Sequence, residues 1–146
     1  MRSLTALVIL VAVVAGCSSA PADSGSAGGG GGDGVFPPPG VVWFGPAFDA
    51  TTLSLAERSN QIKQGSPAVA VAKLPTARPA SEVRVQVSSG STSFPPEPVT
   101  AANGTDSADL FAIDLSPKAL TPNTWIVNFI GPNGRILASG FLPITK

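Results

Sequence analysis

Glu82-Val83-Arg84-Val85-Gln86-Val87-Ser88 is the stretch of sequence that decides the fold, because apolar and polar side chains alternate in it without a break. Successive side chains of an extended strand point to opposite faces of a sheet. The three valines therefore share one face, and Arg84 and Gln86 share the other. A strand that packs on one side and faces water on the other is typical of an antiparallel sheet covering a core.

Short apolar runs recur about every ten residues from Val41 onward, cut by Gly, Pro, Asn and Ser, which is the spacing of a β-sandwich. The 15 prolines and the absence of a long 3.6-residue period exclude a helical bundle. We therefore predict an all-β antiparallel sandwich of about seven strands over residues 41–146. The expected strands are Val41–Phe48, Ala68–Leu74, Ser81–Ser88, a weak one near Phe94–Thr100, Leu110–Leu115, Thr124–Ile130 and Arg135–Ile144.

The same alternation predicts which side chains form the core. Besides the three valines, the inward residues are expected to be Phe111, Ile113, Leu115, Trp125, Val127 and Phe129, joined by Val69, Val71 and Trp43. One short helix of one or two turns is expected at Ser54–Ile62, because Ser54-Leu55-Ala56-Glu57 fits a capping box.

The C-terminal third carries the most specific signals of the domain. Gly131-Pro132-Asn133-Gly134 lies between two apolar runs and predicts a tight hairpin, with Gly134 in the left-handed position. Just upstream, Leu120-Thr121-Pro122-Asn123-Thr124-Trp125 resembles the tyrosine corner that opens strand F of immunoglobulin-like and fibronectin-type sandwiches. Trp125 stands where Tyr would be and Asn123 where Gly would be. The chain has no Tyr, so an indole N–H would have to replace the hydroxyl.

That resemblance implies an immunoglobulin-like sandwich without its usual disulfide, since Cys17 is the single cysteine of the chain. Cys17 itself follows a short basic head, Met1-Arg2-Ser3, and the apolar run Leu4–Val14. As a helix this run would reach about 16 Å, too short for a hydrocarbon core of about 30 Å, and is typical of a secretory leader.

Val14-Ala15-Gly16-Cys17 resembles the lipobox of bacterial lipoproteins. The resemblance implies that residues 1–16 are a signal peptide and that Cys17 is diacylated and begins the mature chain. The alternative is a secreted protein with an incidental thiol. Residues 17–40 hold a glycine run and Pro37-Pro38-Pro39, so we predict a disordered tether between the lipidated Cys17 and the domain.

Candidate catalytic residues are few. The chain has no His, which removes triads and most zinc sites, and we expect no enzyme activity and no cofactor. Asn103, Asp106 and Asp109 are weak candidates for a calcium loop; a polar turn is the favoured interpretation, because regular calcium-loop spacing is missing. Trp43-Phe44 is either an exposed aromatic platform or, as favoured here, part of the core.

Two functions remain. The first is a lipid-anchored protein on the extracytoplasmic side of a bacterial membrane, whose non-enzymatic sandwich binds a protein or polysaccharide of the envelope through loops or a sheet edge. The alternative is a structural or inhibitory accessory domain that acts on an envelope enzyme, for instance through a protruding Phe94–Pro98 loop. Without Arg2 the chain has one more acidic than basic side chain and no basic cluster, so nucleic acid is not an expected partner.

The anchor can be tested directly. We predict that Cys17→Ser leaves an unlipidated protein that no longer partitions with membranes, because the lipid is the expected apolar anchor. Detergent-phase partitioning measures this. Equal partitioning of Cys17→Ser and the unchanged chain would refute the lipoprotein interpretation.

Overall fold

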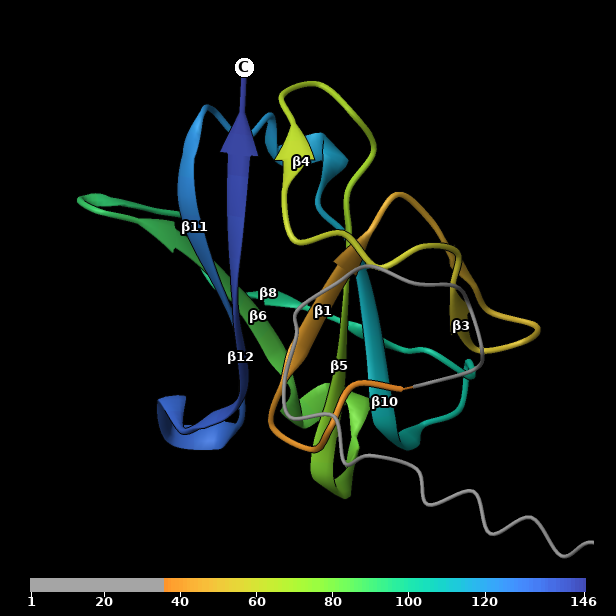
Figure 1. Cartoon of the computed structure of the whole chain (residues 1–146). Coiled ribbons are helices and arrows are strands. Elements are labelled where there is room, and N and C mark those ends of the chain that lie inside the picture. The colour runs from red at the N-terminus through yellow and green to blue at the C-terminus, as the bar shows by residue number, and fades with distance from the viewer. Residues whose placement is uncertain (1–35) are drawn as a thin grey trace, which may run out of the picture.

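Two β-sheets packed face to face make up the fold that the computed structural model describes, over residues 36–146 (Figure 1). The four-stranded sheet has the order β1 (Val42–Gly45), β5 (Val69–Pro79), β10 (Ser107–Asp114) and β9 (Thr100–Ala101). The other sheet has the order β4 (Ile62–Lys63), β12 (Ile136–Thr145), β11 (Asn123–Ile130), β6 (Arg84–Ser89) and β7 (Thr92–Ser93), with β8 (Glu97–Pro98) also on β6. The remaining elements are the hairpin β2 (Phe48–Asp49) and β3 (Ser54–Leu55) and the 3₁₀ turns η1 (Ala80–Glu82), η2 (Ser116–Lys118) and η3 (Pro132–Gly134).

The strand order is that of the immunoglobulin fold. β1, β5, β10 and β9 take the places of strands A, B, E and D, and β6, β11 and β12 take those of C, F and G. All the long strands pair antiparallel. The predicted all-β, immunoglobulin-like sandwich is therefore confirmed.

The core lies between the sheets. Val83, Val85 and Val87 are buried while Arg84 is exposed, as the alternation predicts, and Trp125, Val127 and Phe129 are buried beside them. Phe111 and Leu115 are fully buried from the opposite sheet, and Ile113 packs against the cluster from a partly exposed position. The faces of β6 were predicted correctly because that strand has one apolar face and one polar face.

The inward faces of β1 and β5 were predicted wrongly. Val42, Phe44, Ala70, Ala72 and Leu74 face the other sheet, whereas Val71 belongs to a second cluster on the outer face with partly buried Val69. Trp43 pairs with Val71 across the sheet and so points outward too. A shift of one residue moves a whole side-chain set to the other face, and in a strand apolar on both faces the pattern cannot choose between them.

The outer face of the four-stranded sheet is apolar because residues 46–61 fold over it. Phe48, Leu53 and Leu55 pack there against Val71 and Leu110. The helix predicted at Ser54–Ile62 is therefore wrong: Ser54–Leu55 is β3 and Ile62 begins β4.

Two features explain why no helix forms there. Leu53 has φ 54°. The hydroxyl of Ser54 bonds that of Thr52 at 2.7 Å instead of capping a helix. The carboxylate of Asp49 accepts the N–H groups of Thr51 and Thr52 at 2.8 and 3.3 Å, which holds the turn and lowers the Asp49 pKa.

The first strand joins the two sheets. Val41 forms a parallel bridge with Ser139 of β12, and the Ser139 N–H donates to the Gly40 carbonyl at 3.1 Å, before the chain pairs with β5. A Cβ at Gly140 would lie 2.8 Å from the Cβ of Val42. Gly140 is therefore required for this crossing, because no larger residue fits under Val42.

Residues 36–40, which the sequence assigns to the tether, lie against the sandwich. Pro37 is buried, and the Gly40 N–H donates to the Lys73 carbonyl at 2.8 Å. The predicted signal peptide, Cys17 and the rest of the tether lie outside the described residues. Within residues 36–146 there is no helix long and apolar enough to cross a membrane.

The corner before β11 is formed by tryptophan. The Trp125 indole Nε1–H donates to the Thr121 carbonyl at 2.9 Å, four residues upstream. The expected substitution of indole for phenol is therefore confirmed, and it gives the buried indole its hydrogen-bond partner.

The hairpin between β11 and β12 is also confirmed. Gly134 has φ 71°, and the Gly131 N–H donates to the Arg135 carbonyl at 2.8 Å. The weak strand expected near Phe94–Thr100 is instead two strands of two residues, β8 and β9, on different sheets. Pro95, Pro96 and Pro98 lack the N–H groups that a longer strand would need.

Alternation along β6 gives a direct test of the fold. Val85→Asp places an unpaired carboxylate at a position that is 1 % exposed and should cost several kcal/mol, comparable to the stability of the whole domain. Arg84→Asp, one residue away and exposed, should cost under about 0.5 kcal/mol. Urea denaturation compares the two variants, and similar midpoints would contradict the assignment of faces.

The tryptophan corner gives a second test. Trp125→Phe keeps a ring against Phe94, whose centroid lies 5.7 Å away, but removes the donor to Thr121, and should lower the free energy of unfolding by about 1–2 kcal/mol. Trp43→Phe is the matched control, because the Trp43 indole has no hydrogen bond within residues 36–146 and is half-buried. An equal loss in both variants, measured by urea unfolding, would show that the hydrogen bond does not stabilise the corner.

Candidate functional site

The Asn103–Asp109 loop is arranged as a polar turn. The Asn103 Oδ1 accepts the backbone N–H and the hydroxyl of Thr105 at 3.2 and 2.7 Å, and Gly104 has φ 70°. The Asp106 carbonyl accepts the Ala80 N–H, and the Asp109 carboxylate lies 3.9 Å from the Lys73 ammonium. No group of three His, Cys, Asp or Glu residues within 36–146 is placed to hold a metal ion. The side chains of Asn103 and Asp109 thus have partners inside the protein.

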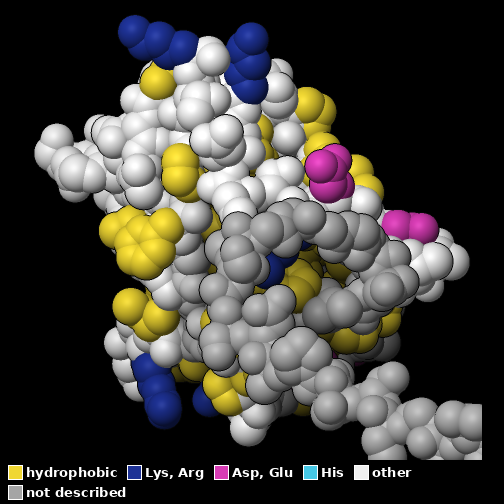
Figure 2. All heavy atoms as spheres, viewed as in Figure 1, with side chains coloured by type: hydrophobic (Ala, Val, Ile, Leu, Met, Phe, Trp, Pro, Cys, Tyr) yellow, Lys and Arg dark blue, Asp and Glu magenta, His cyan; other side chains and the backbone are white. Residues whose placement is uncertain are grey.

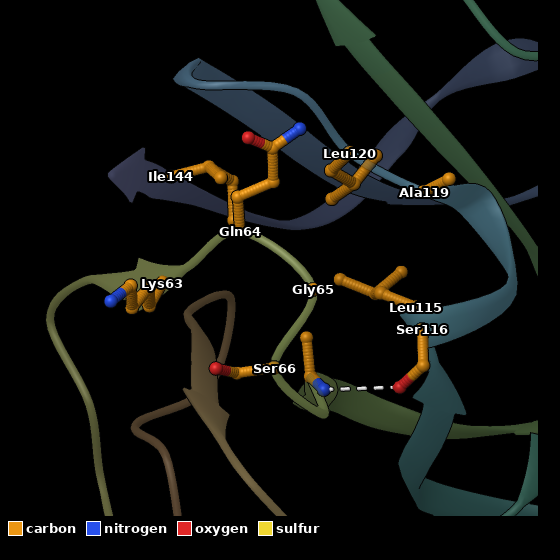
Figure 3. A pocket seen from close by; sticks show the side chains of 10 residues that line it. Lys63, Gln64, Gly65, Ser66, Leu115, Ser116, Ala119, Leu120 and Ile144 are labelled. Atoms are coloured by element: carbon orange, nitrogen blue, oxygen red, sulfur yellow. Dashed lines mark hydrogen bonds between the residues drawn. The ribbon is translucent and has the colours of Figure 1, made fainter. Parts of the chain in front are cut away.

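A small hollow lies at one end of the sandwich, between the β4–β5 loop and η2 (Figure 3). Leu115, Leu120 and Ile144 line it, and the Ser116 hydroxyl accepts the Ala68 N–H at 3.1 Å. Its volume is about 60 Å³, room for a few water molecules, whereas ligand pockets hold several hundred Å³. The hollow is therefore much smaller than a typical ligand pocket.

The aromatic pair near the N-terminus of the domain is not an exposed platform. Phe44 is buried in the main core. Trp43 is half-buried, and the Arg58 guanidinium lies 4.5 Å from its ring centroid. A cation stacked on the ring occupies the surface that a ligand would need.

The outer face of the six-stranded sheet is different, because exposed apolar side chains lie on it. Phe141 on β12 is 66 % exposed and Ile136 is 57 % exposed, the two largest exposures among the large apolar residues of 36–146. Phe141 lies opposite partly buried Ile126, with Pro143 two residues further along β12. An exposed aromatic side chain next to other apolar groups is typical of a binding surface.

A row of polar side chains runs across three neighbouring strands beside Phe141. Ser139, Asn128 and Gln86 are neighbours on β12, β11 and β6. The Ser139 hydroxyl donates to the Asn128 carboxamide oxygen at 2.7 Å, and all three side chains are partly exposed. We call this surface the open face: Gln86, Ser88, Ile126, Asn128, Ser139, Phe141 and Pro143, with Lys63 at one border and Arg84, Arg135 and Ile136 at the other.

The charges of the open face are of one sign. Among the cations of residues 36–146, Lys73, Arg78 and Lys118 have acidic partners and Arg58 stacks on Trp43. The cations without such a partner in the described part of the chain are Lys63, Arg84, Arg135 and Lys146. All four belong to the six-stranded sheet or directly adjoin β12.

The acidic side chains nearest the six-stranded sheet have basic partners: Glu97 on β8 pairs with Lys118, and Glu82, just before β6, pairs with Arg78. The other acidic residues in strands are Asp49 on β2 and Asp109 and Asp114 on β10. Figure 2 shows basic side chains at the top and lower left of the molecule, hydrophobic ones along the left edge between them, and acidic ones on the right. The described domain is thus nearly neutral but polarised, with its positive side on the open face.

The sequence alone does not reveal this surface. Phe141 lies in the expected strand Arg135–Ile144, whose faces the pattern did not assign, and Lys63, Arg84 and Arg135 are far apart in the chain. The alternation of Phe141 and Pro143 with Leu142 and Ile144 is the signal that would have found it, since Leu142 and Ile144 are buried. Comparison with known proteins adds no further guide: no protein family matches the chain, and no curated protein matches it.

Proposed function

We propose that this protein is a lipid-anchored extracytoplasmic lipoprotein whose sandwich binds a macromolecule of the bacterial envelope through the open face. The leader and the lipobox ending in Cys17 support the anchor and its location. The absence of His from the chain, together with the small size of the hollow at the end of the sandwich, favours binding over catalysis.

Phe141 is the observation that carries the binding proposal. Leaving a phenyl ring in water forgoes the stabilisation that its burial would give, and residues 36–146 bury their other aromatic side chains more fully. Partly exposed Ile126 and Pro143 extend the apolar surface beside the ring. A flat patch of this kind, bordered by polar groups, has the composition of the centre of an interface.

Binding through the face is favoured over strand addition at an edge. The strands at the ends of the two sheets are short: β1 has four residues, β4, β7, β8 and β9 have two each, and β8 contains Pro98. Short strands and prolines at an edge hinder pairing with an additional strand. A partner is therefore expected to meet side chains of the open face rather than main-chain hydrogen-bonding groups.

The alternative function, a loop that enters an enzyme cleft, receives less support. The Phe94–Pro98 segment packs back on the domain: the Phe94 ring lies 5.7 Å from that of Trp125, and Glu97 forms an ion pair with Lys118. The Lys118 ammonium also lies 5.1 Å from the Phe94 centroid. The segment is held against the corner of β11 instead of projecting from it.

The proposal predicts that Phe141→Glu abolishes retention of the chain on an isolated, detergent-washed envelope fraction, because a carboxylate replaces the apolar centre of the site. Co-sedimentation of the full chain measures retention. Phe36→Glu is the matched control: Phe36 is 38 % exposed, and its ring faces Lys73, away from the open face. Retention of both variants at the level of the unchanged chain would sink the proposal.

A further inference from the structure

The open face has the charge that attracts an anion. Lys63 borders one end of the sheet, and Arg84 and Arg135 lie toward the other, next to Ile130 and Ile136. None of the three has an acidic partner within residues 36–146. Unpaired cations on one side of a domain steer an anionic partner to that side and fix its orientation.

Between these cations the face offers an apolar ring next to hydrogen-bonding groups. Phe141 and Ile126 form one row across the sheet, and Ser139, Asn128 and Gln86 form the adjacent row, about 7 Å along the strands. The bond between Ser139 and Asn128 fixes both side chains before any ligand arrives. A pyranose ring presents one face of C–H groups and a rim of hydroxyls, which match an aromatic ring flanked by hydroxyl and amide groups.

The length of the face indicates a polymer. β12 has 10 residues and therefore spans about 33 Å, with Lys63 beside its last residues and Arg135 just before its first. A single sugar resting on Phe141 would not reach the cations at both ends. An extended chain of sugars lying along β12 would contact the ring and both ends together.

We infer that the partner of the open face is an acidic polysaccharide, which stacks sugar rings on Phe141, bonds Ser139, Asn128 and Gln86, and places its carboxylates against Lys63, Arg84 and Arg135. This inference rests on the proposed function and specifies its ligand. A lipid surface fits less well, because insertion of Phe141 would press the adjoining row of Ser139, Asn128 and Gln86 into the bilayer without partners.

The first experiment measures binding of the full chain in detergent to two polyuronates, polygalacturonate and alginate, and to neutral dextran. The polyuronates should bind, and added salt should weaken binding, because exposed ion pairs are screened. Phe141→Ala should weaken binding about tenfold or more. The double variant Lys63→Gln, Arg84→Gln should weaken binding and flatten its salt dependence.

Matched controls separate the open face from the rest of the surface. Phe36→Ala removes an exposed phenyl ring elsewhere, and Arg58→Gln removes a cation on the opposite side of the sandwich; both should bind like the unchanged chain. No binding to either polyuronate, equal binding of dextran, or unaltered binding by Phe141→Ala would overturn the inference. So would stronger binding to vesicles rich in phosphatidylglycerol than to the polyuronates.

A second experiment separates failure of this inference from failure of the proposed function. The envelope fraction is treated with periodate, which cleaves sugar diols, or with protease, before co-sedimentation. Loss of retention after periodate alone supports an acidic polysaccharide. Loss of retention after protease alone would refute a polysaccharide ligand but would still agree with binding through the open face. Equal retention of Phe141→Glu and the unchanged chain would refute both proposals.

Discussion

Packing between the two sheets is the constraint on which the rest of the structure depends, because residues 36–146 contain no cysteine and hence no disulfide. Val85, Val127, Phe129 and Phe111 fill this layer from both sides and are essentially inaccessible to water. No buried side-chain polar atom in the described domain is left without a partner. The layer between the sheets is therefore held by apolar packing with its polar atoms paired.

The outer faces differ in how their apolar groups are treated. Residues 46–61 cover one face, so Val71 and Leu110 have neighbours there, while Phe141 and Ile126 on the other face meet solvent. The cations divide in the same way: those near the covered face have acidic or aromatic partners, and those near the open face have none within residues 36–146. Exposed apolar side chains and unpaired cations thus lie on the same surface, the open face. This combination is the reason to propose that a partner binds there.

Sequence alone predicted those parts of the fold in which the order of apolar, polar and turn residues fits only one local structure. β6 alternates between apolar and polar residues, and the Trp125 corner and the turn at Gly134 depend on neighbours in the chain. It failed where tertiary packing decides, as in β5, where valines and alanines alternate and both faces are buried, and at Ser54–Leu55, where an apolar sheet face outcompetes a helix cap. Cys17 could be proposed from neighbouring residues. The open face could not, since its cations at 63, 84 and 135 are far apart in the sequence and come to one sheet only when the chain folds.

The crossing of the first strand determines how the domain would carry a mechanical load. Within the described residues, backbone hydrogen bonds join Gly40 to Lys73 and to Ser139, the latter two residues from Phe141 on β12. Tension between the chain ahead of Phe36 and a partner held on β12 would therefore pass through adjacent strands. The bridge between Val41 and Ser139 is parallel, so this tension would act along the strand direction on the bond between Ser139 and Gly40. Most of the sandwich would lie outside the line of force.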